Sequence, residues 1–115
     1  MEDLFDLAGK NILFKSAGSY LGHAMSRALA KYGANIVLTS TKTEKAISIA
    51  EEYSNKYQGK FAGARFDVFD QVSAKNVAVK AIETLGSIDV LVNCANATVT
   101  ETLHEISHER WQEGI

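Results

Sequence analysis

A glycine-containing turn is the part of this sequence whose residues could do chemistry. It directly follows the apolar run Ile-Leu-Phe at 12–14 and leads at once into a helical pattern. The first N–H groups of a helix are unpaired and carry partial positive charge, so a turn of this kind can hold a phosphate. Glycine lets backbone N–H groups approach the anion and lets the helix pack closely on the strand. The turn therefore predicts the phosphate corner of a dinucleotide-binding βα unit. The predicted binding residues are Ser16, Gly18, Ser19, Tyr20, Leu21 and Gly22.

Four apolar runs alternate with helical patterns and would position this turn. We expect strands at residues 11–14, 35–39, 61–68 and 88–92. Strands that alternate with helices predict a parallel sheet, and right-handed crossovers favour the strand order 3-2-1-4. The predicted fold is thus α/β, a Rossmann-type doubly wound sheet truncated after its fourth strand. We expect residues 1–115 to be only the N-terminal part of such a domain, ending within its fourth helix.

Apolar periodicity and capping residues predict how the helices lie. The first helix should bury one apolar face and end near Gly33, and the third should begin at Asp70 and end at Gly86. Thr41 and Glu44 have the spacing of a capping box, which would open the second helix. Ser107 would cap the fourth helix. The expected inward residues are Leu21, Met25, Ala28, Leu29 and Tyr32 on the first helix, and Ile47, Ala50, Tyr53 and Tyr57 on the second.

Composition excludes several functional classes. Apolar residues make up 46% of the chain and charged residues 23%, which is typical of a soluble globular protein. A net charge of −2 argues against a nucleic-acid binder. The single cysteine, Cys94, rules out an internal disulfide and fits a reducing cytoplasm. No apolar stretch approaches the ~20 residues that would span a bilayer. We expect a cytoplasmic protein without nucleic-acid or membrane partners.

Within this framework the chain resembles the short-chain dehydrogenase/reductase family. The family's motif TGxxxGxG falls on residues 15–22, where Gly22 is kept while Ser16 and Tyr20 replace the other two glycines. Its motif NNAG falls on residues 93–96, which read Asn-Cys-Ala-Asn. The segment Gly-Ser-Tyr-Leu-Gly at residues 18–22 most resembles the corresponding segment of gluconate and other sugar-acid dehydrogenases.

The resemblance implies an NAD(P) cofactor and further binding residues. Asp67 and Val68 close the third expected strand, where the family has an aspartate that contacts the adenine amino group. Asn93 would steady the region of the fourth strand, and Ala95 would line the adenosine side. Structural alternatives stay open: Gly22 could serve only helix–strand packing, Asp67 could be a turn residue, and Asn93 could be purely structural.

The end of the second strand bears on cofactor choice. Enzymes that prefer NAD place a carboxylate there, about 20 residues past the glycine turn, to bind the ribose 2′-OH. Here Ser40 occupies that position and Thr41 and Lys42 follow. These groups could hold a 2′-phosphate, so we expect NADP in preference to NAD. The alternative is that Lys42 points only to solvent.

The residues that would catalyse hydride transfer are missing. The family supplies a serine and a Tyr-x-x-x-Lys pair after the fourth strand, and no tyrosine here is followed four residues later by lysine. His104 and His108 have a chelating spacing but no evident third ligand, so we expect neither catalytic residues nor a metal site. Two hypotheses remain: the coenzyme-binding half of an oxidoreductase that acts on a small alcohol, carbonyl or sugar acid, or a truncated or decayed non-catalytic nucleotide-binding or interaction module. The apolar fourth strand would leave an open edge, so self-association is possible in either case.

Overall fold

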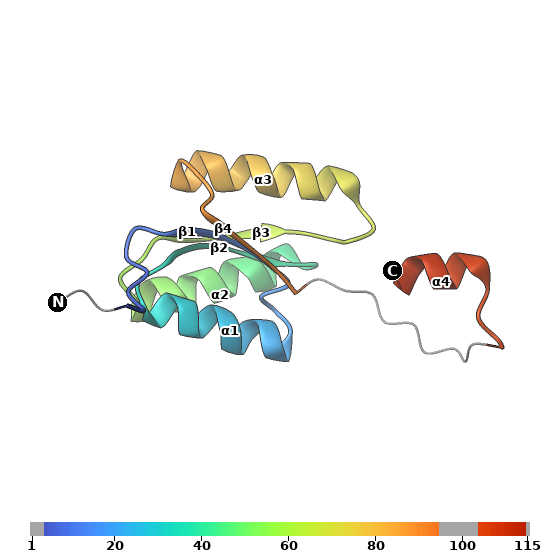
Figure 1. Cartoon of the computed structure of the whole chain (residues 1–115). Coiled ribbons are helices and arrows are strands. Elements are labelled where there is room, and N and C mark those ends of the chain that lie inside the picture. The colour runs from blue at the N-terminus through green and yellow to red at the C-terminus, as the bar shows by residue number, and fades with distance from the viewer. Residues whose placement is uncertain (1–3, 95–103, 115) are drawn as a thin grey trace.

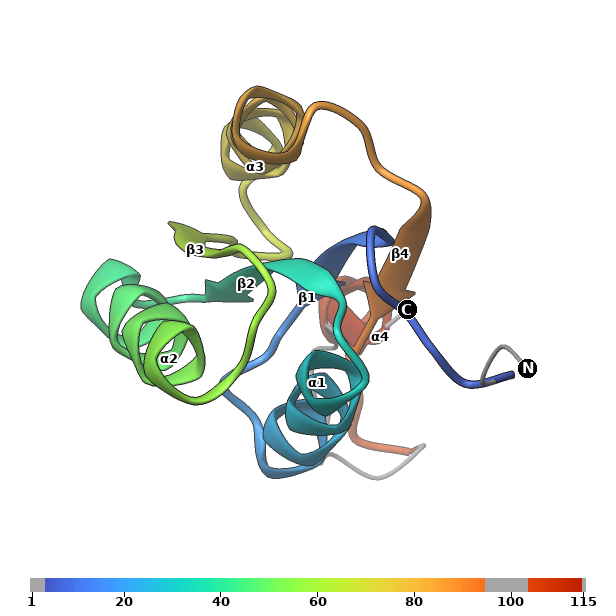
Figure 2. The same ribbon diagram turned by 90° about the vertical axis from the view of Figure 1, so that its left-hand side faces the viewer.

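Four parallel strands form one sheet in the order β3-β2-β1-β4, which confirms the predicted topology. The computed structural model describes residues 4–94 and 104–114. The strands are β1 (Asn11–Lys15), β2 (Asn35–Ser40), β3 (Phe61–Arg65) and β4 (Val90–Asn93). Helices α1 (Tyr20–Lys31) and α2 (Thr43–Lys56) cover one face of the sheet, and α3 (Gln71–Leu85) covers the other (Figures 1 and 2). A short helix, α4 (His108–Gly114), lies near the C-terminal end of the described residues.

Two hydrophobic clusters lie on opposite faces of the sheet. Alternate residues of β1 point to opposite sides, so Ile12 and Phe14 pack towards α1 and α2 while Leu13 packs towards α3. All three side chains are at most 4% exposed. Because both faces are covered, β1 and β2 read as continuous apolar runs, as strands of parallel sheets do.

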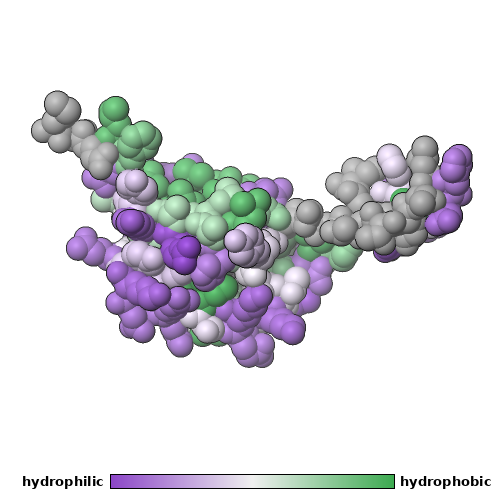
Figure 3. Space-filling model, turned by 90° about the horizontal axis from the view of Figure 1, so that it is seen from below, coloured by the Kyte–Doolittle hydropathy of each residue, from purple (hydrophilic) through white to green (hydrophobic). Residues whose placement is uncertain are grey.

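The first helix buries a different stripe from the one expected. Its buried residues are Gly22, Ser26 and Ala30, whereas Leu21 and Tyr32 are exposed. Small side chains let α1 lie close to the sheet, while Leu21 and Met25 are exposed and Leu29 is only partly buried. Figure 3 shows hydrophobic residues gathered on one side of this face of the molecule and hydrophilic ones on the other. The periodicity identified an apolar stripe but not what the stripe faces.

The second helix also begins differently. Lys42 is its N-cap residue and makes no side-chain capping bond, so the predicted Thr41–Glu44 capping box is wrong. Instead, the hydroxyl oxygen of Ser40 accepts a hydrogen bond from the Lys42 N–H at 3.3 Å, which turns the chain into the helix. Ile47, expected inside, is exposed. The helix buries Ala46, Ile49, Ala50 and Tyr53.

The third strand is shorter than predicted. It ends at Arg65, and the expected last residues, Asp67 and Val68, lie in the turn that follows. The Asp67 carboxylate accepts a hydrogen bond from the Phe69 N–H at 2.9 Å, which bends the chain out of the sheet. Asp70 then caps α3 as predicted, accepting from the N–H groups of Val72 and Ser73.

Candidate functional site

The predicted binding turn begins where β1 ends, at the carboxyl edge of the sheet. Ser16 has φ = +67°, the left-handed conformation that glycine adopts most readily. The Thr39 hydroxyl fixes this geometry: it accepts from the Ser16 N–H at 2.9 Å and donates to the Phe14 carbonyl at 2.9 Å. Thr39 is fully buried in β2. The sequence analysis missed this role, because a threonine within an apolar run reads only as a strand residue.

The rest of the turn is built around the Ser16 carbonyl. The Ser19 hydroxyl donates to that carbonyl at 3.1 Å and accepts from the Gly22 N–H at 3.0 Å, so Ser19 is the N-cap of α1. A Cβ atom on Gly22 would collide with the Ser16 carbonyl oxygen and lie 2.8 Å from the Ser19 hydroxyl. Gly22 is therefore required for packing of the turn whether or not a ligand binds.

This arrangement limits which backbone N–H groups could donate a hydrogen bond to a phosphate. The Ser19 N–H is directed at the Ser16 carbonyl at 3.4 Å, and the Gly22 N–H is taken by the cap. The N–H groups of Tyr20 and Leu21 stand at the first helical positions, which have no acceptor within their own helix. The first turn of α1 contains no acidic residue, so no carboxylate on that turn competes with an anion.

A pocket of about 570 Å³ extends from this turn between α1 and α2. Gly18 and Ser19 line one end, and Arg27 and Lys45 contribute basic side chains. Ser40, at the end of β2, is nearly buried, with its hydroxyl 3.3 Å from where a Cβ on Gly18 would stand. The structure thus brings Ser40 beside the glycine turn. Thr41 and Lys42 are exposed and do not line this pocket.

Lys45 is a candidate binding residue that the sequence analysis did not single out. Its Cε atom lies 3.1 Å from the Cβ position on Gly18, so its side chain crosses the glycine turn. The residue stands five positions after Ser40. Only the point at which α2 begins decides whether a lysine there faces the turn or solvent.

Asp67 already has structural partners. Beyond the Phe69 bond, its carboxylate forms an ion pair with Arg65 at 3.5 Å, and its own N–H donates to the Ser73 hydroxyl at 3.0 Å. These contacts support the alternative that Asp67 is a turn residue. The neighbouring Val68 is 42% exposed.

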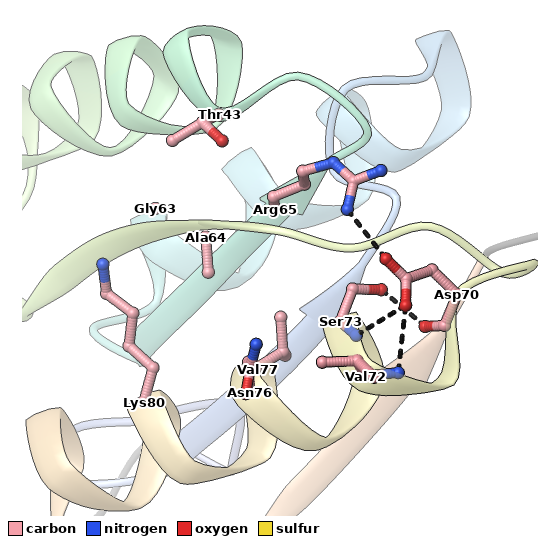
Figure 4. Close-up of a pocket in the computed structure, with 10 residues that line it drawn as sticks. All are labelled: Thr43, Gly63, Ala64, Arg65, Asp70, Val72, Ser73, Asn76, Val77 and Lys80. Carbon is pink, nitrogen blue, oxygen red and sulfur yellow. Dashed lines mark hydrogen bonds and ion pairs between the residues drawn. The ribbon is translucent and has the colours of Figure 1, made fainter.

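A second pocket, of about 270 Å³, lies between β3 and α3 and shares no lining residue with the first. Figure 4 shows Arg65 directed at Asp70, with a distance of 3.2 Å between the guanidinium and the carboxylate. The pKa of Asp70 is lowered by the Ser73 backbone N–H and by the Arg65 side chain. This pocket stands apart from the glycine turn.

At the other side of β1, Asn93 ends β4 and is paired in register with Lys15. The Lys15 ammonium lies 4.6 Å from the centre of the Phe66 ring, a cation–π contact. Ala95 falls outside the described residues. The described part of the chain thus places Ser16, Ser40 and Asn93 at the carboxyl ends of three adjacent strands. In doubly wound sheets ligands bind outside those ends, where the strand order reverses.

Two further expectations concern metals and membranes. His104 and His108 are both exposed, and the described residues contain no group of three side chains able to hold a metal ion. Among the described helices, none has the length and apolar character needed to cross a membrane.

Comparison with known proteins decides the family. Residues 10–115 match the family described as short chain dehydrogenase. The chain belongs to that family. It is 34% identical over 116 residues to 5-keto-D-gluconate 5-reductase of Escherichia coli, covering all of this chain and 45% of the relative. It is 34% identical over 112 residues to gluconate 5-dehydrogenase of Gluconobacter oxydans, covering 96% of this chain and 43% of the relative.

Solved structures of this dehydrogenase family agree with the fold. L-Sorbose reductase from Gluconobacter frateurii, solved with NADPH and L-sorbose, superposes with a TM-score of 0.86 at 27% identity. The match covers 94% of this chain and 41% of the reductase. A short-chain dehydrogenase/reductase from Mycobacterium marinum gives a TM-score of 0.85 at 26% identity, covering 97% of this chain and 46% of that one. The chain therefore spans less than half the length of each of these four relatives.

Proposed function

We propose that this chain is the coenzyme-binding half of an NAD(P)-dependent oxidoreductase that exchanges hydride with a small alcohol, carbonyl or sugar-acid substrate. One observation carries the proposal. The turn from Ser16 to Gly22 leads into α1 at the carboxyl edge of the sheet. The N–H groups of Tyr20 and Leu21, at the start of that helix, have no acceptor within the helix. A glycine turn at the start of such a helix can hold a pyrophosphate, which supports the proposal. The sugar-acid relatives support the substrate class.

In this proposal each predicted binding residue has a place along the dinucleotide. The glycine turn holds the pyrophosphate through the N–H groups of Tyr20 and Leu21. Asn93, Asp67 and Val68 would lie on the adenosine side, and so would Ala95, which is outside the described residues. The cofactor supplies the hydride, and this half of the protein binds and orients it.

NADP is the proposed cofactor, in preference to NAD. Ser40 offers a hydroxyl where an NAD enzyme would present a carboxylate, so nothing at that position repels a 2′-phosphate. Thr41 and Lys42, which follow β2, are exposed. The NADPH complex of L-sorbose reductase and the NADP-dependent mannitol dehydrogenase of Alternaria alternata, 28% identical to this chain, support the assignment. We place the protein in the cytoplasm, without nucleic-acid or membrane partners.

A second candidate function is a non-catalytic nucleotide-binding or interaction module. It is favoured by Ser16, which holds a left-handed conformation without being glycine, and by the commitment of Asp67 to a turn. The absence of Tyr-x-x-x-Lys is compatible with both candidates.

Calorimetric titration of the purified chain with NADP and NAD, at low and high salt, tests the proposal. Amide NMR shifts would locate the ligand. We expect NADP to bind more tightly and to shift the Tyr20 and Leu21 amides most, with the preference weakening at high salt. Absence of binding by either dinucleotide would overturn the proposed function, and tighter binding of NAD would overturn the cofactor assignment.

A further inference from the structure

Three groups from different elements meet beside the glycine turn. Gly18 has no side chain, and a Cβ built on it would lie 3.1 Å from Lys45 Cε and 3.3 Å from the Ser40 hydroxyl. Lys45 comes from α2, Ser40 from the end of β2 and Gly18 from the loop after β1. The missing Cβ therefore leaves room for a lysine side chain and a hydroxyl to converge on one point.

The polar groups at this point are available to an anion. The Ser40 oxygen accepts from the Lys42 N–H, and its hydroxyl hydrogen can still be donated. Within the described part of the chain, the ion pairs involve Lys56 and Arg65 but not Lys45. Its ammonium group is thus not neutralised by a neighbouring carboxylate. Arg27 adds a second positive charge to the same pocket.

Lys42 is less well placed than Lys45. It is the N-cap of α2, it is exposed, and it does not line the pocket that starts at Gly18 and Ser19. Lys45 lies almost one helical turn further along and lines that pocket.

We propose that Lys45, together with the Ser40 hydroxyl, is the group that selects a phosphate monoester on the adenosine ribose, and so makes the site specific for a 2′-phosphorylated dinucleotide. This inference rests on the proposed function and deepens it. An ammonium group recognises phosphate as a point charge and needs no bidentate geometry. Gly18 is part of this phosphate-selecting site, because a side chain at that position would displace Lys45.

The test compares Lys45→Met with Lys42→Met in the full chain. Methionine keeps a long apolar stem over Gly18 but removes the charge. Dissociation constants would be measured for NADP, NAD, 2′,5′-ADP and 5′-ADP. We expect Lys45→Met to weaken NADP and 2′,5′-ADP binding about tenfold, the loss of one charge-assisted hydrogen bond, and to leave NAD and 5′-ADP unchanged. Lys42→Met should have a smaller effect, and Lys45→Arg should restore most of the preference.

The outcomes separate the two proposals. If the parent chain prefers NADP and Lys45→Met keeps the same NADP to NAD ratio, the role of Lys45 is wrong while the proposed function stands. An equal loss for all four ligands would also overturn it, because a charge that selects the 2′-phosphate must contribute more to NADP binding than to NAD binding. If the parent binds no dinucleotide, both proposals fail. Thermal unfolding of each variant would show that the fold is intact, as expected for an exposed side chain.

Discussion

The carbonyl oxygen of Ser16 occupies the space that a Cβ atom on Gly22 would need. Residues six positions apart are thereby locked together, and the start of α1 is held against the end of β1. The relationship explains why Gly22 is the glycine of the TGxxxGxG motif that this chain retains. Ser16 can replace another of its glycines only by adopting a left-handed conformation.

Gly22→Ala should disrupt the turn. We expect the free energy of unfolding to fall by about 1–3 kcal/mol, because backbone cannot yield as a flexible side chain does. Gly18→Ala is the matched control, since its nearest neighbour is the mobile Lys45 stem, and it should cost less. Chemical denaturation of both variants measures the difference. Equal stability of the Gly22→Ala and Gly18→Ala variants would contradict the assigned contact.

Gly22→Val should likewise weaken dinucleotide binding more than Ser19→Ala.

Ser16→Gly should stabilise the chain. A left-handed conformation costs a residue with a Cβ roughly 1–2 kcal/mol, which glycine does not incur. Part of that gain is lost to the greater freedom of glycine in the unfolded chain, so we expect a net increase of about 1 kcal/mol. Ser54→Gly, within α2, is the control and should destabilise. The prediction fails if Ser16→Gly lowers the midpoint of denaturation.

Asp70 should make stability depend on acid pH. Its folded-state pKa lies below the usual 3.8, chiefly because the Ser73 N–H and Arg65 donate to the carboxylate. The stabilisation is therefore complete above about pH 3.8 and is lost as pH falls through the lower folded-state value. Asp70→Asn keeps a capping side chain but removes the charge. We expect the variant to be less stable than the parent at neutral pH and to approach it well below pH 3.8. A stability gap that is the same at both pH values would refute this.

The 115-residue chain on its own should show no dehydrogenase activity. Nothing in it replaces the Ser and Tyr-x-x-x-Lys groups that the family resemblance implies for proton transfer. The assay would follow NADH and NADPH with a panel of sugar acids and ketones. Turnover above that of a no-protein control would contradict the prediction.

Self-association should occur through β4. This strand is an edge of the sheet, and Val90 and Leu91 on it are 41% and 55% exposed. Unpaired backbone groups beside apolar side chains favour pairing with another chain. We expect sedimentation to show association that Leu91→Lys reduces, while Lys80→Leu on α3 does not. A cooperative monomer at high concentration would be evidence against it.

Local sequence determined the strand order and most element boundaries. Each apolar run, such as Ile-Val-Leu at 36–38, alternates with a helical pattern, so the strands and the 3-2-1-4 order followed from periodicity and crossover handedness. Asp70 and Gly86 marked the ends of α3 because capping is a local interaction.

Tertiary structure decided the contacts between elements. The buried stripe of α1, with Gly22, Ser26 and Ala30, depends on how closely the helix approaches the sheet, and the apolar pattern of the helix alone does not encode that distance. Lys45 reaches the glycine turn only because α2 begins at Thr43 and Gly18 leaves space for it. A binding site assembled from three elements is defined by their packing, and packing is a property of the folded chain rather than of any one segment.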